Sequence, residues 1–416
     1  MVILFEKRFL LYVSCLSLCL FVGCNKDEEM GVCDVYTQNC QRAFENVYKI
    51  MYLSERYNYT GLKVEDVAER FKIVHISDLH IASWTVDNSP ENPQNLLEAV
   101  RFSNFPNMKI NALVATGDIV WQNEKTDRET IQRYMDSFVS AFYKDNSVPS
   151  FVCTGNHDAN MFTKDESYYL SKKDIHEHLF GRKNYERRQP VGENYYYSDL
   201  PDPSGGTIRI IALDNLDQDG FKYPSLNYSC ITQKQVDWLV NVALKEGMTQ
   251  DHAVIILNHH PLQPYSKNQT TYMSSGVHLY DEKLVPDIIN AFIKRGILDR
   301  TYKTVKAPAN TIHTKADFSG CLGEFICYLG GHTHTFADFD VLCNDSLQAK
   351  QVMLLSNTLS PGLQNNKFGN IERKGQSDNS NSFAIYAIDR KEKKIYRTFF
   401  GAYPVDMPVI EAIPYR

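Results

Sequence analysis

The sequence predicts an α/β fold in which two mixed β-sheets are flanked by helices. Short apolar, β-branched segments alternate with amphipathic segments from residue 71 to about residue 155, as is typical of strands joined by crossover helices. After residue 190 the chain contains many further short apolar segments and few helical ones. Two packed mixed sheets accommodate this number of strands.

In the first half, strands are predicted where a short apolar segment ends at a polar or glycine-containing loop. These strands are 71–76, 112–116 and 150–154. Helices are predicted over 95–102 and over 128–143, where apolar residues recur at helical spacing. Folds of this class bind ligands in loops at the carboxyl ends of strands, so the loops after the three strands are candidate site positions.

Helices and strands after residue 190 are predicted from the same spacing of apolar residues. Helices are predicted over 233–245 and 282–294, and residues 391–400 suggest a closing hairpin. The further strand candidates are 195–198, 208–213, 253–257, 325–329, 352–355 and 383–388.

The N-terminus predicts a bacterial lipoprotein. Lys7 and Arg8 precede an apolar segment, 9–22, of fourteen residues, whereas a spanning helix needs about 20. Gly23 and Cys24 follow, which resembles a lipobox whose cysteine becomes lipidated. We therefore expect a signal peptide over 1–23 and a lipid anchor on Cys24 in the bacterial cell envelope, at the outer membrane, on its periplasmic or surface face. An uncleaved anchor and an ordinary secretion signal are the alternatives.

Residues 24–70 are predicted to form a tether and a helical extension. The net charge is −6 and no Lys/Arg block is present, which argues against a nucleic-acid-binding surface. An oxidising compartment permits disulfides, but seven cysteines follow Cys24, an odd number that leaves at least one thiol free. We expect Cys153 to be free, and Cys33–Cys40 and Cys321–Cys327 to be local bridges. None of the seven shows zinc-site spacing.

Five short polar motifs each follow an apolar segment and supply carboxylate, imidazole or amide ligands. They are Asp78-Leu79-His80, Gly117-Asp118, Gly155-Asn156-His157-Asp158, Asn258-His259-His260-Pro261 and Gly331-His332-Thr333-His334. Each motif alone is weak evidence for a metal site. Together, however, the five motifs supply enough ligands for two adjacent cations. Such ligands suit Zn, Fe or Mn, and two metals about 3.5–4 Å apart are the usual device for hydrolysing phosphate esters.

Over residues 71–345 these motifs resemble the calcineurin-like metallophosphoesterase family, which includes purple acid phosphatases and class III cyclic-nucleotide phosphodiesterases. The resemblance implies a four-layer α/β/β/α sandwich with the metals at its edge, completed by strands from residues 346–416. It implies a metal-dependent phosphoric ester hydrolase in which a metal-bridging hydroxide attacks phosphorus in line. Val120 and Trp121 stand where purple acid phosphatases carry their colour-giving tyrosine, so no purple enzyme is expected.

The family pattern also implies the role of each residue. One metal is expected to be held by Asp78, His80, Asp118 and His334, and the other by Asp118, Asn156, His259 and His332, with His260 as the alternative to His259. His157 is expected to donate a hydrogen bond or proton to the phosphate or the leaving group. Asp158 either orients His157 or stabilises the loop.

The substrate is predicted to be a small phosphate ester or a phosphorylated headgroup. A diester is slightly preferred, because no Arg or Lys stands inside the motifs to clamp a doubly charged monoester, although Lys267 or Arg295 is a candidate clamp. Residues 83–93 and 263–320 are predicted inserts near the site, and Trp84, Trp121, Tyr265 and Tyr272 are candidates either for stacking on a substrate or for packing the inserts. A phosphomonoesterase and a non-catalytic binding lipoprotein of the same fold are the alternatives.

Overall fold

The protein is described from a computed structural model. The structure describes residues 70–81, 91–160, 165–217, 228–229, 231–262, 277–278, 283–303, 311–342, 350–359, 381–404, 407–415 and parts of 39–50. Several predictions from the sequence fall outside these ranges. They concern the signal peptide 1–23, the lipid anchor on Cys24, the Cys33–Cys40 bridge, and residues Trp84, Tyr265, Lys267 and Tyr272.

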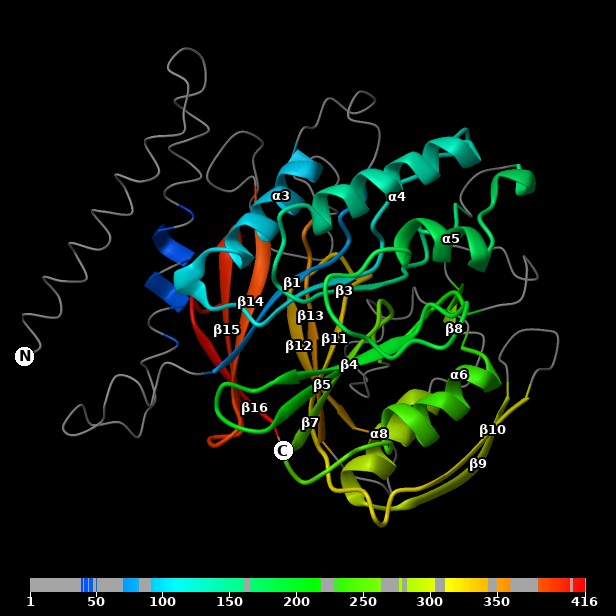
Figure 1. The fold of residues 1–416 in the computed structure, drawn as a ribbon, viewed down its shortest axis with the longest axis vertical. Helices are drawn as coiled ribbons and strands as arrows, with labels where there is room; N and C mark the ends of the chain where they lie inside the picture. Colours follow the sequence, from blue (N-terminus) through cyan, green and yellow to red (C-terminus); the bar gives the residue numbers. More distant parts are fainter. Residues whose placement is uncertain are drawn as a thin grey trace, which may run out of the picture.

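Two six-stranded mixed sheets form the centre of the molecule (Figure 1). The first sheet has the order β16 (Glu411–Pro414), β15 (Lys394–Gly401), β14 (Ser382–Asp389), β1 (Phe71–Ile76), β2 (Ala112–Thr116) and β3 (Ser150–Cys153). The second has the order β12 (Ala337–Leu342), β13 (Lys350–Leu355), β11 (Glu324–Gly330), β7 (His252–Leu257), β5 (Thr207–Ala212) and β4 (Tyr196–Pro201).

Both sheets combine parallel and antiparallel strands. In the first sheet β1, β2 and β3 run parallel, while β14 pairs antiparallel with β1. In the second sheet β5, β7, β11 and β13 run parallel, and β4 and β12 are antiparallel edge strands. The parallel strands of each sheet therefore share one edge at which their carboxyl ends meet.

Helices cover the outer face of each sheet. The helices α3 (Glu91–Ser103), α4 (Arg128–Tyr143) and α5 (Lys172–Leu179) lie on the side of the first sheet, and α6 (Gln233–Trp238) and α8 (Leu284–Lys294) lie on the side of the second (Figure 1). A π-helical turn, Leu239–Ala243, continues α6. The predicted α/β/β/α order of layers is thereby confirmed.

Smaller elements complete the described chain. They are the 3-10 turns Pro106–Met108 and Glu166–Tyr168, the pair β6 (Tyr228–Ser229) and β8 (Val277–His278), and the pair β9 (Ile297–Lys303) and β10 (Thr311–Asp317). With α8, the pair β9–β10 occupies the predicted insert 263–320, where only the helix was expected. The strands β12 and β16 were likewise not predicted.

Strand β7 shows how one strand serves two cores. Ala253, Ile255 and Leu257 belong to the apolar core between the sheets, and Val254 and Ile256 belong to the core under α6 and α8. Because successive side chains of a strand point to opposite faces, a strand buried on both faces is a continuous apolar run. The sequence 253–257 is such a run, and it ends directly before the motif that contains His259.

The same alternation explains why one predicted disulfide is wrong. Cys153, Cys321 and Cys327 are all free and buried. Cys327 lies in the core between the sheets, whereas Cys321 lies in the core under the helices and its thiol donates to the Leu244 carbonyl at 3.2 Å. The second sheet separates the two thiols, so Cys321 and Cys327 do not bridge. The prediction that Cys153 is free is confirmed.

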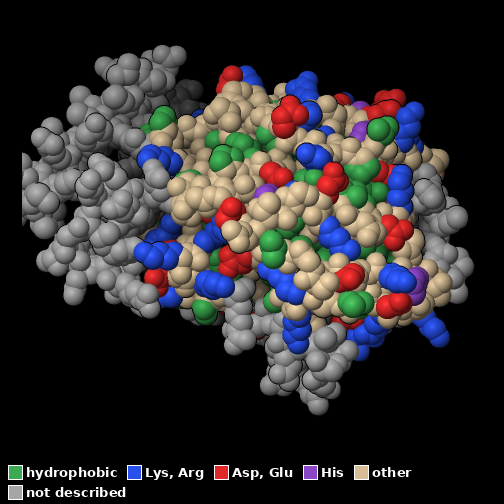
Figure 2. All heavy atoms as spheres, turned by 60° about the horizontal axis from the view of Figure 1, so that its bottom comes forward, with side chains coloured by type: hydrophobic (Ala, Val, Ile, Leu, Met, Phe, Trp, Pro, Cys, Tyr) green, Lys and Arg blue, Asp and Glu red, His purple; other side chains and the backbone are tan. Residues whose placement is uncertain are grey.

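The surface in Figure 2 mixes both charge signs. Lys and Arg side chains are interspersed with Asp and Glu over this face, and hydrophobic side chains are scattered among them. This face therefore offers no field of a single sign. None of the described helices is long and apolar enough to cross a lipid bilayer.

Candidate metal centre

The seven predicted metal ligands converge from strand ends of both sheets. Asp78 and His80 follow β1, Asp118 follows β2 and Asn156 follows β3, all in the first sheet. From the second sheet, one ligand follows β7 and two follow β11; these are His259, His332 and His334. The candidate site therefore lies where the carboxyl-end edges of two sheets meet, and it exists only when the sheets are docked.

One group of potential ligands consists of Asp78, His80, Asp118 and His334, whose ligand atoms all lie within 4.8 Å of one another. The Nε2 atoms of His80 and His334 are 3.1 Å apart. Nε2 of His80 lies 3.6 Å from Oδ2 of Asp118, and Nε2 of His334 lies 3.5 Å from Oδ1 of Asp78. Three of the four ligands come from the first sheet and one from the second.

A second group consists of Asp118, His259 and His332, again with ligand atoms within 4.8 Å of one another. Nε2 of His259 lies 3.2 Å from Oδ2 of Asp118 and 3.0 Å from Oδ1 of Asn156. Asp118 thus belongs to both groups, and its Oδ2 atom faces an imidazole of each. This arrangement allows one carboxylate to serve two cations.

The hydrogen bond of His259 indicates whether the second group of potential ligands suits a metal. Its Nδ1 lies 2.8 Å from the carbonyl oxygen of Thr116, which only accepts, so Nδ1 carries a proton. When Nε2 gives up its proton, it presents a lone pair toward the oxygens of Asp118 and Asn156. In the metal-free site burial disfavours that proton, but the charge of Asp118 outweighs burial and raises the pKa of His259 to about 9. Histidine ligands are usually oriented by such a bond from their other nitrogen. A nitrogen with two oxygens at 3.0 and 3.2 Å supplies three electron-pair donors for a cation that replaces the proton.

His332 supports the same conclusion. Its Nε2 atom is buried and has no hydrogen-bond partner in the part of the chain that the structure describes. Its backbone amide donates to both carboxylate oxygens of Asp78, at 3.0 and 3.1 Å. A buried ring nitrogen without a partner carries a desolvation cost, which coordination to a cation removes.

The backbone is strained at the candidate ligands. Asp78, His80, Asp118, His332 and His334 all have positive φ, between 47° and 72°. Residues other than glycine seldom adopt this conformation, and such strain is concentrated at functional sites. The sharp turns bring side chains separated by one residue, such as His332 and His334, to one centre.

Two motif glycines allow the loops to approach one another. A Cβ atom at Gly155 would overlap the backbone amide and the carboxylate of Asp118, and a Cβ atom at Gly331 would overlap Ser77 and the carboxylate of Asp78. These glycines are therefore required by contact distance. The spacing of the motifs in the sequence did not indicate that these two loops come into contact.

The buried charges of the metal-free site are strongly coupled. Burial raises the pKa of Asp78 to about 7, and the negative charge of Asp118 adds to that rise. For Asp118 burial acts in the same direction, but His259 and His157 outweigh it and hold the pKa well below the ordinary range. Burial lowers the pKa of His80 and of His332. Protons and a cation therefore compete for the same atoms, and metal binding is expected to depend on pH.

His157 lies beside the two groups. Its Nε2 is 3.9 Å from Oδ2 of Asp118, and its ring stacks on Trp121 with centroids 5.2 Å apart and planes 21° apart. Its Nδ1 has no hydrogen-bond partner among the described residues. Burial lowers the pKa of His157, against the opposing charge of Asp118.

Asp158 fastens two loops together. Its Oδ1 accepts from the amides of Ile119 and Val120 at 2.9 and 3.1 Å, and its Oδ2 accepts from the amide of Gly155 at 2.7 Å. These bonds favour the loop-stabilising role that the sequence left open, and they leave no hydrogen bond from Asp158 to Nδ1 of His157.

The candidate site has a buried centre and a partly exposed edge. Asp78, His80, Asp118 and His259 are essentially fully buried. The partly exposed residues around them are Trp121, His157, His332 and His334. We call these four side chains the rim.

Two other residues predicted from the sequence are not among the potential ligands or the rim. They are Arg295, the candidate substrate clamp, and His260, the alternative metal ligand. The guanidinium of Arg295 donates to the Leu322 carbonyl at 3.0 Å, before the start of β11, whereas His332 follows its end. Arg295 therefore lies at the far end of that strand and is not a clamp for the substrate. His260 is buried, with its ring centroid 4.5 Å from that of His332, but it belongs to neither group of potential ligands.

Comparison with known proteins agrees with this geometry. The family model described as calcineurin-like phosphoesterase matches residues 71–299, which is more than half of the chain. The chain belongs to the calcineurin-like phosphoesterase family and is a metal-dependent phosphoester hydrolase.

Two further comparisons add little. No curated protein matches the chain. A solved structure titled "Structure of PhoD" is similar at 10% identity and a TM-score of 0.39, over 83% of this chain and 73% of that one. At this level the similarity adds nothing to the family assignment.

Proposed function

We propose that the protein is a two-metal phosphoesterase that prefers diesters to monoesters. The observation that carries this proposal is the position of Asp118, whose Oδ2 lies 3.6 Å from Nε2 of His80 and 3.2 Å from Nε2 of His259. Each histidine belongs to a different group of potential ligands. A carboxylate shared in this way is suited to hold two cations side by side.

The donor sets assign the ligands of each cation. Asp78, His80, Asp118 and His334 would hold one, and Asp118, Asn156, His259 and His332 would hold the other. Imidazole and carboxylate donors suit Zn, Fe or Mn. When bound, a cation pair supplies an activated water as nucleophile and neutralises charge on the phosphoryl oxygens.

His157 is the residue proposed to act on the substrate directly. It is partly exposed on the rim, and its ring is held between Trp121 and the Asp118 carboxylate. From there a ring N–H donates a hydrogen bond to a phosphoryl oxygen, or a proton to the departing alcohol. Trp121 restricts the ring plane, so that the donor is oriented before substrate binds.

The preference for a diester follows from the charges around the centre. The ion pairs that the structure shows for Asp78 and Asp118 are all with histidines. Arg295, the candidate clamp within the described residues, is at the far end of β11. A monoester phosphate carries about two negative charges near neutral pH and gains most from a guanidinium or ammonium partner. A diester carries one and needs less compensation.

The cellular setting is proposed from the sequence alone. Gly23 and Cys24 end a short apolar segment, so we propose a lipid anchor on Cys24 in the bacterial cell envelope. The substrate would then be a small phosphate ester or a phosphorylated headgroup that reaches the envelope.

A paired substrate assay tests this function. Release of p-nitrophenol is measured from bis-p-nitrophenyl phosphate and from p-nitrophenyl phosphate, after chelation and again after adding Mn²⁺, Zn²⁺ or Fe²⁺. We expect metal-dependent release from both, with the larger kcat/KM for the diester. A larger value for the monoester would support the phosphomonoesterase alternative. No metal-dependent release from either would support the non-catalytic binding protein.

A further inference from the structure

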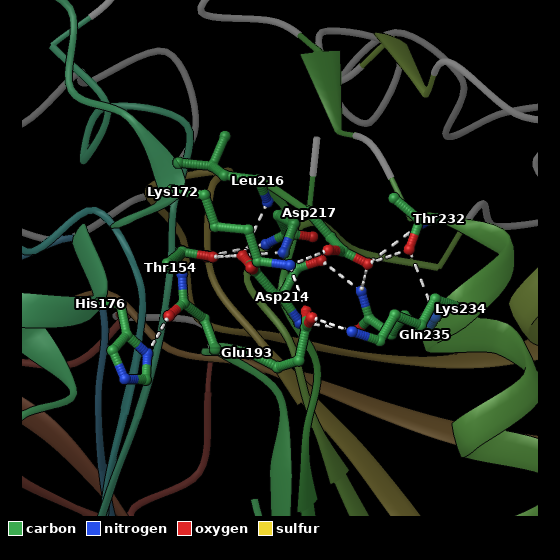
Figure 3. Close-up of polar contacts among 12 residues, drawn as sticks. Thr154, Lys172, His176, Glu193, Asp214, Leu216, Asp217, Thr232, Lys234 and Gln235 are labelled. Atoms are coloured by element: carbon green, nitrogen blue, oxygen red, sulfur yellow. Dashed lines mark hydrogen bonds and ion pairs between the residues drawn. The ribbon is translucent and has the colours of Figure 1, made fainter. Parts of the chain in front are cut away.

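A largely buried polar cluster joins the two sheets beside the loop that carries Asn156. It contains Thr154 after β3, Asp214 and Asn215 after β5, and the residues that hold them; these are Asp217, Gln235, Lys172 and Glu193 (Figure 3). We call this set the sheet-bridging cluster. None of its members belongs to either group of potential metal ligands.

Thr154 is bound to the second sheet through its hydroxyl and its carbonyl. Its hydroxyl donates to Oδ1 of Asp214 at 2.5 Å and accepts from the backbone amide of Asn215 at 3.2 Å. Its carbonyl accepts from the side-chain amide of Asn215 at 2.9 Å. Because Thr154 is two residues before Asn156, these bonds fix the start of the loop that carries Asn156 and His157.

Asp214 is itself held firmly. Its Oδ1 also accepts from the amide of Leu216 at 2.9 Å, and its own amide donates to Oε1 of Gln235 at 2.9 Å. Nε2 of Gln235 donates to the Asp214 carbonyl at 3.0 Å and to Oδ2 of Asp217 at 2.9 Å. Asp214 therefore presents a fixed acceptor to Thr154.

Lys172 offsets part of the negative charge of the cluster, which contains the three carboxylates of Asp214, Asp217 and Glu193. Its ammonium forms ion pairs with both Asp217 and Glu193, and Figure 3 shows it reaching into the cluster among their carboxylates. The paired carboxylates of Asp217 and Glu193 tolerate burial, whereas Oδ2 of Asp214 has no hydrogen-bond partner among the described residues. The cluster is therefore a rigid support for Thr154.

The sheet-bridging cluster affects metal binding because the proposed ligands of the second cation come from both sheets. Asn156 follows β3 of the first sheet, whereas His259 and His332 follow strands of the second. Nε2 of His259 is only 3.0 Å from Oδ1 of Asn156, so a small shift between the sheets would separate these donors.

We propose that Thr154 and Asp214 are positioning residues that place Asn156 for the cation shared with His259 and His332. This inference rests on the proposed two-metal function. Residues that hydrogen-bond a metal ligand typically change metal affinity by about 10–100-fold when they are removed. Thr154 acts one step further out, through the backbone that leads to Asn156, so we expect an effect at the lower end of that range. Loss of the Thr154 hydroxyl should therefore weaken one of two cation-binding steps, the same step that Asn156→Ala weakens.

Tyr196 supplies a matched control. Its hydroxyl, on β4 of the second sheet, bonds the amide and the carbonyl of Val152 on β3, at 2.8 and 3.0 Å. It joins the same two sheets at a position two residues before Thr154. Tyr196→Phe removes a comparable pair of hydrogen bonds and should lower the free energy of unfolding to a similar extent, without reaching the metal ligands.

The test is calorimetric titration of the metal-depleted full chain with Mn²⁺, together with thermal unfolding. The variants are Thr154→Val, Thr154→Ser, Asn156→Ala and Tyr196→Phe, with Thr154→Ala as a second removal of the hydroxyl if the valine variant does not fold. We expect two binding steps in the wild type. One of them should weaken about tenfold or more in Thr154→Val, and stay within about twofold of the wild type in Thr154→Ser, which keeps the hydroxyl.

The outcomes separate this inference from the proposed function. If Thr154→Val binds Mn²⁺ as the wild type does, or loses no more affinity than Tyr196→Phe, the positioning role is overturned while the two-metal function stands. If the wild type itself binds no Mn²⁺, Zn²⁺ or Fe²⁺, the two-metal function fails, and the positioning role fails with it.

Discussion

Trp121 stacks on His157, with ring centroids 5.2 Å apart and planes inclined by 21°. The same indole meets His80 edge-on, with centroids 5.2 Å apart and planes inclined by 73°. Trp121 thus contacts both a candidate metal ligand and the proposed proton donor, and it is partly exposed on the rim. We therefore interpret it as the side chain that fixes the orientation of His157.

Trp121→Ala tests this interpretation. Without the indole the His157 ring is free to rotate, so we expect kcat on bis-p-nitrophenyl phosphate to fall by up to about 10²-fold, as misplacement of a catalytic group does. Metal content should be unchanged. Trp121→Phe keeps a flat ring and should retain most of the activity. Equal losses in both variants, or a fall in metal content, would contradict the orienting role.

His157→Ala should slow turnover without removing metal. The side chain is in neither group of potential ligands, and loss of a general acid typically costs about 10²–10⁴ in rate. The loss should be smaller for an ester with a good leaving group, such as p-nitrophenol, than for an alkyl ester, whose alcohol needs the proton more. The comparison requires kcat for both esters. If the losses were equal, His157 would act through the phosphoryl oxygens only.

Gly155→Ala should abolish metal binding through backbone contact alone. The added Cβ would overlap the amide and carboxylate of Asp118, so the two loops must separate. Gly320→Ala is the matched control, because no atom lies within 4 Å of a Cβ placed there. The test is the amount of metal bound by each purified variant, which should be lost in Gly155→Ala and kept in Gly320→Ala. Normal metal content in Gly155→Ala would mean that the loops need no such close approach.

His75 should make the stability of the protein fall as the pH is lowered. Burial lowers its pKa to about 3 in the folded state, whereas in the unfolded chain it is about 6.5. The folded state keeps the ring neutral while the unfolded chain takes up a proton, so stability that is present above pH 6.5 is lost as the pH falls toward 3. Between pH 8 and pH 5 the loss from this residue is about 2 kcal/mol.

Urea unfolding of the metal-free protein at the two pH values measures this loss. His75→Gln should reduce the pH dependence by about 2 kcal/mol. An unaltered slope in His75→Gln would show that the buried ring takes up a proton when folded.

The sequence predicted the parts of the fold that depend on local pattern. The strands 71–76 and 112–116 and the helix 128–143 have the predicted bounds, because continuous apolar runs and helical spacing follow directly from burial. The ligand types and their strand-end positions followed from the same patterns. The family resemblance then predicted that the seven ligands form one site.

Features that depend on how the sheets dock were not predictable. The alternation in 311–317 is carried by Thr314 and Ala316 as well as Ile312, so it is too weakly apolar to indicate β10. Cys321 and Cys327 are close in sequence, but they lie in cores on opposite sides of the second sheet. The bond between Thr154 and Asp214 joins residues far apart in the chain.

Metal stoichiometry in two ligand variants tests the central claim, the shared role of Asp118, most directly. Elemental analysis after saturation with Mn²⁺ or Zn²⁺ and removal of free metal should give about two cations per wild-type chain. It should give one for His334→Ala, which belongs to one group only, and none for Asp118→Ala, which belongs to both. Two cations retained by folded Asp118→Ala, or none bound by the wild type, would contradict the account.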